Sequence, residues 1–191
     1  DPRNPGAVDE IIHLGDYWNE EKIKQYREEI IAGNLEIGRM FQRAYRYIKA
    51  AALVHEDMAE INKLAADMGR INIIADKMLK EIFDGTGISY REGRQRHLFA
   101  SAITPEGIKC YIDSILNEEK VYRIISEQGM GAEKILEKVR SSAVERGFYV
   151  ESYYCALNPL KLEHIVIPRI NVAVTTTNNY HSAQVSAYRE F

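Results

Sequence analysis

Long apolar runs are absent from this sequence, and no stretch approaches the ~18 consecutive apolar residues that a transmembrane helix needs. Cysteine is scarce, and Cys110 and Cys155 form neither a disulfide framework nor a C-x-x-C metal motif. Excess positive charge is also missing, because the net charge is −3 and the isoelectric point is about 6.0. These absences argue against a membrane protein and against nucleic acid as a partner, so we expect a cytoplasmic protein with reduced thiols.

The ends of the sequence also lack familiar signals. The opening residues, DPRNPGAVDE, have neither the basic start nor the apolar stretch of a signal peptide, and they do not begin with Met. The closing segment, Thr176–Phe191, is polar and reads as an unfinished element. We therefore expect a fragment of a longer protein, and its 191 residues are enough for one domain with a helical extension.

A helical region is predicted for residues 19–84. Asn19 is a good N-cap and precedes Glu20 and Glu21, which the helix dipole favours in a first turn. Apolar residues then recur at heptad spacing, which is typical of a helix that packs against another helix. One series is Ile23, Ile30, Ile37, Ala44, Ala51, Met58 and Ala65, and the other is Tyr26, Gly33, Met40, Tyr47, Val54, Ile61 and Met68.

An unbroken helix through all these heptads would span roughly 70 Å at 1.5 Å per residue. We therefore expect a turn near His55–Asp57, followed by a second helical piece that ends near Phe83, which makes a helical hairpin. Basic residues on the opposite face of the first helix favour a solvated surface with ion pairs over a nucleic-acid site; they are Arg39, Arg43, Arg46 and Lys49.

Asp84-Gly85-Thr86-Gly87 is the clearest breaker in the sequence and the predicted domain boundary. The basic segment Tyr90–Arg96 after it is either a linker or a source of arginines for a nucleotide. Strands are predicted at His97–Ile103, Val121–Ile125, Tyr149–Cys155 and Ile170–Thr175, and helices from Thr104-Pro105 to Leu116 and from the glycine loop to Arg146. Strands that alternate with helices indicate an α/β fold with a mostly parallel sheet covered by helices.

The loop between the strand that starts at Val121 and the following helix carries Gly129 and Gly131. Strand, glycine loop and helix form the context of a phosphate-binding P-loop, G-x-x-x-x-G-K-[ST], which needs a lysine for the phosphates and a hydroxyl for Mg²⁺. Laid on this pattern, the sequence keeps the second glycine and replaces the other three positions: Ser126 stands for glycine, Ala132 for lysine and Glu133 for the hydroxyl residue.

Longer segments resemble a little-characterised bacterial family of tandem P-loop ATPases, in which one chain holds two NTPase-like halves. Residues 1–18, with GAVDEIIHLGDYW, are similar to the tail of a first half, and residues 19–84 to the helical segment of that family. His97–Ser182 is similar to the start of a second half, above all in HLFASAITPEG, ERGFYVESYYCALNPLKLEHIVIP and NVAVTTTN, and the half-domain is predicted at residues 85–191. The resemblance implies a P-loop NTPase-like sheet with flanking helices, with ATP and Mg²⁺ as ligands and the other half as partner.

This sequence differs from the family at the P-loop positions that bind the phosphates and Mg²⁺. Without the lysine, the transferred phosphoryl group loses its main stabilising charge, and Glu133 places a carboxylate where phosphates should lie. Lys134 comes two residues late and leaves from another side of the first helical turn. We expect weak nucleotide binding or none, with no catalytic residue, and the weak candidate site is Ser126, Gly129, Gly131, Ala132, Glu133 and Lys134.

Two functions compete at this stage: a P-loop ATPase-like nucleotide-binding half without hydrolysis, and a non-catalytic interaction module that uses the helical hairpin. An exposed sheet edge would also favour a homo-oligomer. Histidines show no i,i+4 metal pair, although His164 and His181 could approach the loop. Cys155 reads as a small core residue, and Thr175–Thr177 ends a strand without the acidic residue that an NTPase often carries there.

Overall fold

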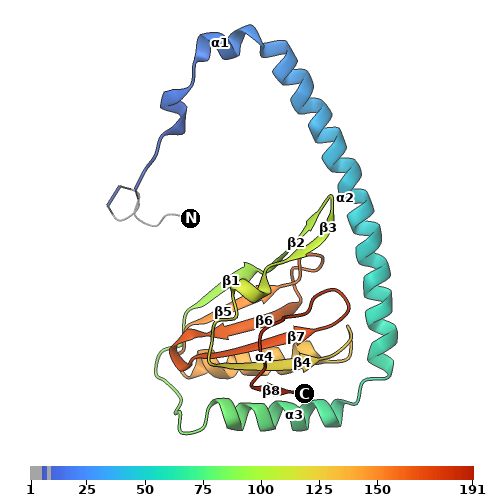
Figure 1. The fold of residues 1–191 in the computed structure, drawn as a ribbon, viewed down its shortest axis with the longest axis vertical. Helices are drawn as coiled ribbons and strands as arrows, with labels where there is room; N and C mark the ends of the chain where they lie inside the picture. Colours follow the sequence, from blue (N-terminus) through green and yellow to red (C-terminus); the bar gives the residue numbers. More distant parts are fainter. Residues whose placement is uncertain (1–5, 8–9) are drawn as a thin grey trace. The chain divides into compact units, whose positions relative to one another are not determined.

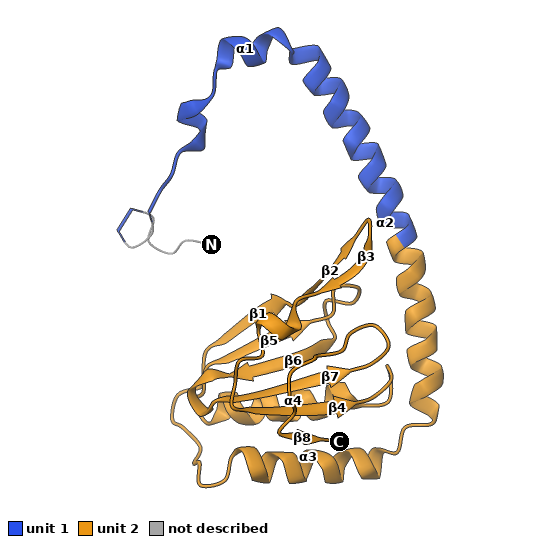
Figure 2. Ribbon diagram, in the orientation of Figure 1, with its two compact units in different colours: residues 1–47 blue, residues 48–191 orange. Residues whose placement is uncertain are grey.

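The computed structural model describes residues 6–7 and 10–191. The chain divides into two compact units, residues 1–47 and 48–191 (Figure 2). The predicted tail, 1–18, therefore lies partly outside the described residues. The predicted boundary at Asp84–Gly87 lies inside the second unit, whose core includes residues on both sides of it.

Helices dominate the first part of the chain. They are the 3-10 helix η1 (Leu14–Tyr17), α1 (Glu20–Gln25), α2 (Arg27–Leu64) and α3 (Met68–Ile82). Asn19 caps α1 as predicted, because its side chain accepts a hydrogen bond of 3.0 Å from the Lys22 amide. The turn predicted near His55–Asp57 is wrong, since α2 continues to Leu64 and the chain turns only where Asp67 caps α3 through the Arg70 amide at 3.0 Å.

The helical hairpin is also wrong, because α3 packs against the sheet-bound helix α4 (Ala132–Glu145) and not back along α2 (Figure 1). The predicted heptad face of α2 stays exposed at Val54, Met58 and Ile61. Its half-buried residues follow a neighbouring stripe at spacings of three and four: Ile48, Ala52, His55, Ala59 and Asn62. Helical periodicity thus predicted the helix correctly and the packed face incorrectly.

A six-stranded mixed sheet forms the centre of the second unit, in the order β1-β5-β6-β7-β4-β8 (Figure 1). Its strands are β1 (Gln95–Phe99), β4 (Lys120–Ile125), β5 (Val150–Tyr154), β6 (Leu162–Ile167), β7 (Val172–Thr177) and β8 (Arg189–Glu190). Neighbouring strands are parallel except for β6, which is antiparallel to both β5 and β7. The α/β class is confirmed, whereas the mostly parallel P-loop sheet is corrected to a mixed one. The reversal follows from a short link, since only a turn connects β5 to β6 where a parallel pair would need a crossover helix.

The helix predicted from Thr104 to Leu116 is replaced by a β-hairpin. Strands β2 (Ser101–Thr104) and β3 (Gly107–Cys110) pair antiparallel, followed by the 3-10 helix η2 (Ile112–Ser114). Pro105 takes a turn position that also suits its fixed φ, and Gly107 supplies a φ of +102° that a helix cannot use. The signals that indicated a helix N-terminus were therefore turn signals.

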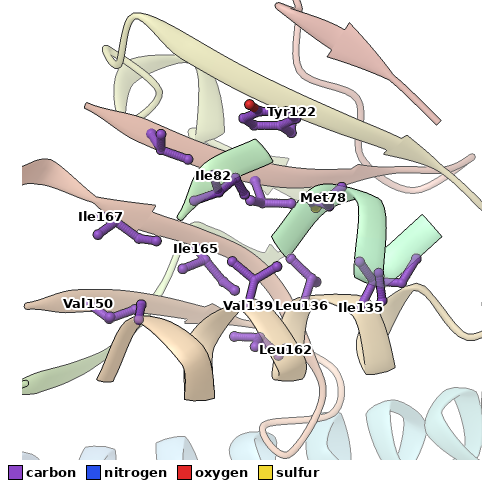
Figure 3. Close-up of a cluster of buried hydrophobic side chains, with 14 of the residues drawn as sticks. Met78, Ile82, Tyr122, Ile135, Leu136, Val139, Val150, Leu162, Ile165 and Ile167 are labelled. Atoms are coloured by element: carbon purple, nitrogen blue, oxygen red, sulfur yellow. The ribbon is translucent and has the colours of Figure 1, made fainter. Parts of the chain in front are cut away.

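The main core lies between the sheet and the helices α3 and α4. In Figure 3, Met78 and Ile82 of α3 meet Leu136 of α4 and Ile165 of β6, and all four are buried. Gly147 has a φ of +76° and ends α4 as predicted. The other face of the sheet has a smaller core, which residues 100–116 and 183–185 help to cover.

The closing polar segment packs on the sheet in the structure. The 3-10 helix η3 (Pro168–Ile170) leads into β7, and the chain then returns so that β8 pairs in parallel with β4. Arg123 holds this segment, since its guanidinium pairs with Glu190 at 2.6 Å and donates to the Ala183 carbonyl at 3.0 Å. Residues 180–191 therefore belong to the sheet unit.

Candidate functional site at the carboxyl edge of the sheet

Strands β1, β4, β5 and β7 all run in one direction and end at one edge of the sheet. Because β6 runs the opposite way, its first residues, Leu162 and Glu163, lie at this same edge. Ligands of open α/β sheets gather at the carboxyl ends of their parallel strands. The predicted glycine loop and a buried polar cluster both lie here.

The loop between β4 and α4 has the local geometry that the glycines predicted. Gly129 and Gly131 have φ values of +80° and +96°, in the left-handed region. The φ at Gly131 favours glycine, and an added Cβ atom would lie 2.4 Å from Cδ1 of Ile71 in α3, so the end of this side chain would have to move. The strand, glycine loop and helix are therefore in place.

The side chains that give a P-loop its chemistry are missing from this loop. Ala132 is the buried first residue of α4, and Glu133 follows in its first turn. Lys134 is exposed and its Nζ lies 3.5 Å from Sδ of Met68, so the ammonium points toward the start of α3. Ser126 uses its hydroxyl to donate to the Glu127 carbonyl at 3.1 Å. No ammonium group among these residues is directed into the loop.

Helix α2 packs directly on this loop within the second unit. The Asn62 amide donates to the Gln128 carbonyl at 2.9 Å. A Cβ atom added at Gly129 would lie 2.0 Å from the Ala59 carbonyl oxygen, which shows how closely the two backbones approach. At Gly129 the loop therefore faces a carbonyl oxygen, which repels an anion.

Arginines of the segment 90–96 do not supply the missing charge at this edge. The Gly93 amide donates to the Val144 carbonyl at 2.8 Å, and the Ser89 amide donates to the Glu145 carbonyl at 3.0 Å. These bonds fasten the segment to the C-terminal end of α4, whereas the glycine loop is at the N-terminal end of that helix. The nucleotide role considered for Arg91, Arg94 and Arg96 finds no support in this placement.

A cavity of about 450 Å³ lies beside the loop. Its walls come from α2, from the β2–β3 hairpin and from the carboxyl edge of the sheet, and they are mostly apolar, with Val54, Met58 and Ile103 among them. Gln128 of the loop also lines it, together with Glu163 and His181. The cavity thus joins the loop to the polar cluster.

The cluster consists of Glu163, His164 and His181, all of them buried. His164 Nδ1 is 2.8 Å from the Thr175 hydroxyl, and His181 Nε2 is 3.0 Å from the Thr176 hydroxyl. The two imidazole rings meet edge to face, with centroids 4.9 Å apart. Threonines at the end of β7 therefore orient both histidines.

Burial governs the protonation of these groups. It lowers the pKa of His164 well below its ordinary value, and the nearby His181 and Lys161 add to the shift. Burial also lowers the pKa of His181, although Glu163 opposes this effect. Both rings are therefore neutral near pH 7. Burial and Glu163 raise the pKa of the Cys155 thiol, so this cysteine stays protonated and remains a small buried residue.

A β-bulge explains how two consecutive residues can serve one cluster. Tyr153 pairs with His164 and Tyr154 with Leu162, so Glu163 is an extra residue in β6. Bulges re-aim side chains and occur often beside functional sites. His164 and His181 were predicted to approach the loop from the sequence, whereas Glu163 was not. β7 ends without an acidic residue, and the acidic residue at this edge, Glu163, belongs to the antiparallel strand β6.

Comparison with profiles of known protein families, with curated proteins and with solved structures gives no match. Across the described residues, no helix combines the length and the apolar character that crossing a bilayer requires.

Proposed function

We propose that the chain is a hydrolysis-deficient P-loop-type half-domain, which binds ATP weakly or not at all and acts within a larger ATPase-like protein. The absence of the lysine and of the Mg²⁺-binding hydroxyl, where Ala132 and Glu133 stand, carries this proposal. The contact of α2 with the loop adds to it, because Asn62 and the Ala59 carbonyl lie against Gln128 and Gly129. The strand, loop and helix keep the shape of a nucleotide site without its charge.

The test is titration of the purified chain with a fluorescent ATP analogue, with and without Mg²⁺. We expect weak or absent binding by the natural sequence and a gain of binding by Ala132→Lys with Glu133→Ser. Ala132→Met with Glu133→Ser is the matched control, because it supplies a similar side-chain length without the charge. Tight Mg²⁺-dependent binding by the natural chain would refute the proposal, as would an equal gain in the control.

A second candidate function is self-association through the first unit, which is the interaction-module alternative with a second copy of this chain as partner. All side chains of residues 10–47 are exposed, including the apolar residues Ile30, Ile37 and Met40. A shallow apolar groove of about 270 Å³ lies among Ile37, Met40 and Phe41. Seven-residue spacing of such residues favours a partner helix.

Charge along this helical region favours an antiparallel pairing. Residues 20–36 carry five acidic and three basic side chains, whereas residues 37–47 carry three arginines and no acid. If Ile37 of one copy faced Met40 of the other, Glu36 would lie near Arg43 of the second copy. Opposite charges beside an apolar seam specify this orientation.

Sedimentation velocity across a range of protein concentrations tests the pairing. We expect a dimer that weakens as salt is raised, and a monomer after Ile37→Lys. Gln42→Lys adds the same charge on the far side of the helix and should leave the dimer intact. A natural chain that stays monomeric at every concentration, or a dimer that survives Ile37→Lys, would refute this candidate.

A further inference from the structure

Three metal-ligating side chains converge at the polar end of the cavity. One carboxylate oxygen of Glu163 and one ring nitrogen each of His164 and His181 lie within 4.8 Å of one another. Their exposed fractions are only 4%, 1% and 8%. Buried polar side chains gathered this closely need a common partner or a dense hydrogen-bond network.

Hydrogen bonds fix which nitrogen of each histidine is free. The Thr176 hydroxyl donates to the Glu163 carbonyl at 3.1 Å, so it accepts from His181 Nε2–H. The Thr175 hydroxyl likewise donates to the Thr176 carbonyl at 3.3 Å and accepts from His164 Nδ1–H. The remaining nitrogens, Nδ1 of His181 and Nε2 of His164, therefore carry lone pairs.

This arrangement is the one that metal-binding histidines use. A ligating imidazole usually donates its second N–H to an oxygen acceptor, which fixes the tautomer and the ring orientation. In this protein two adjacent threonines of one strand, Thr175 and Thr176, provide both acceptors. The histidines are thus prepared to act as neutral donors.

Glu163 lacks a close counter-charge. Within the described part of the chain, the cationic groups near its carboxylate are Lys161 Nζ at 4.0 Å and His181 Nδ1 at 3.9 Å. Both distances are at the limit of an ion pair, so neither group holds the carboxylate closely. A buried carboxylate is costly unless a cation lies against it.

We propose that Glu163, His164 and His181 bind one divalent transition-metal ion of the Zn²⁺ class. Two imidazoles and a carboxylate are a common three-ligand set, and such sites leave coordination positions open. Glu163 and His181 line the cavity, so the open positions face it and can take water or an anionic group of a ligand. The three ligands lie outside the glycine loop, although they share its cavity, and the metal titration below does not depend on nucleotide binding.

Lys161 gives the proposal a distinctive signature. The Lys161 ammonium lies 4.0 Å from the Glu163 carboxylate that the metal would bind. The metal and Lys161 would therefore compete for this carboxylate. Lys161→Gln removes this competition and should tighten metal binding. If Lys161 and Glu163 formed only a structural ion pair and bound no metal, Lys161→Gln would not raise the affinity for the metal.

The experiment is a competition titration of the chelator-treated chain with Zn²⁺ against a chromophoric chelator, supported by the visible spectrum of the Co²⁺ form. We expect one ion per chain and a lowered affinity in His164→Gln, His181→Gln and Glu163→Gln. Thr176→Val should weaken binding by about 10- to 100-fold, the usual effect of losing a residue that orients a ligand. His97→Gln, which changes an exposed histidine on β1, is the matched control and should leave affinity unchanged.

Far-UV circular dichroism of each variant without metal separates lost ligands from lost folding. The proposal is overturned if the natural chain binds no ion, if the three ligand variants bind as tightly as the natural chain, or if His97→Gln weakens binding equally. Failure here would leave the ATP titrations unaffected, because those substitutions lie at the glycine loop.

Discussion

Replacing Gly129 by alanine tests the contact between α2 and the glycine loop. The φ of +80° at this position costs an L-residue about 1–2 kcal/mol. The new Cβ would lie 2.0 Å from the Ala59 carbonyl oxygen, so α2 and the loop must separate. Loss of the hydrogen bond from Asn62 to Gln128 then adds about 0.5–1.5 kcal/mol. We expect Gly129→Ala to lower the free energy of unfolding by about 1.5–3.5 kcal/mol.

Gly85→Ala is the matched control. Its φ is +69°, and no atom lies within 4 Å of the added Cβ, so it loses only the conformational part, about 1–2 kcal/mol. Urea denaturation followed by circular dichroism measures both variants.

A double-mutant cycle with Asn62→Ala isolates the contact. Asn62→Ala should cost about 0.5–1.5 kcal/mol in the natural chain and almost nothing in the Gly129→Ala background. An equal cost in both backgrounds would show that the loop does not depend on α2, and the reasoning would fail.

Three further predictions concern the sheet unit. Leu136→Ala, at a fully buried residue of α4, should destabilise by about 2–5 kcal/mol in urea denaturation, whereas Leu160→Ala, at an exposed residue, should have little effect. Because the pKa of His164 is depressed in the folded chain, the unfolded chain binds a proton there more readily. With a chelator present, the free energy of unfolding should therefore fall as the pH drops below about 6.5, by up to about 1.4 kcal/mol per pH unit. His164→Gln should flatten this slope. Arg123→Gln should release the segment 180–191, which limited proteolysis would detect as faster cleavage there without loss of the remaining sheet.

Local signals in the sequence predicted much of the fold. Asn19 and Gly147 marked helix ends because capping depends on one residue and its immediate neighbours. The glycines at 129 and 131 marked the loop for the same reason, since a positive φ is a local requirement.

The predictions from the sequence failed where the structure depends on residues that lie far apart along the chain. Ile108 and Ile112 have helical spacing, yet Ile108 belongs to a hairpin whose strands pair with each other. The direction of β6 follows from its two neighbours and not from its own residues. The candidate metal site was missed for this reason, because Glu163 reaches the carboxyl edge only when β6 is antiparallel and bulged.

Pairing between β4 and β8 has a consequence for synthesis on the ribosome. Arg123 and its partner Glu190 are separated by 67 residues, so β4 is made well before the strand that covers its outer side. At about 5–20 residues per second, β8 follows β4 by about 3–13 s. During that interval β4 is an open strand edge that can pair with another nascent chain. We expect co-translational association on polysomes to be strongest in this window and to end once β8 docks.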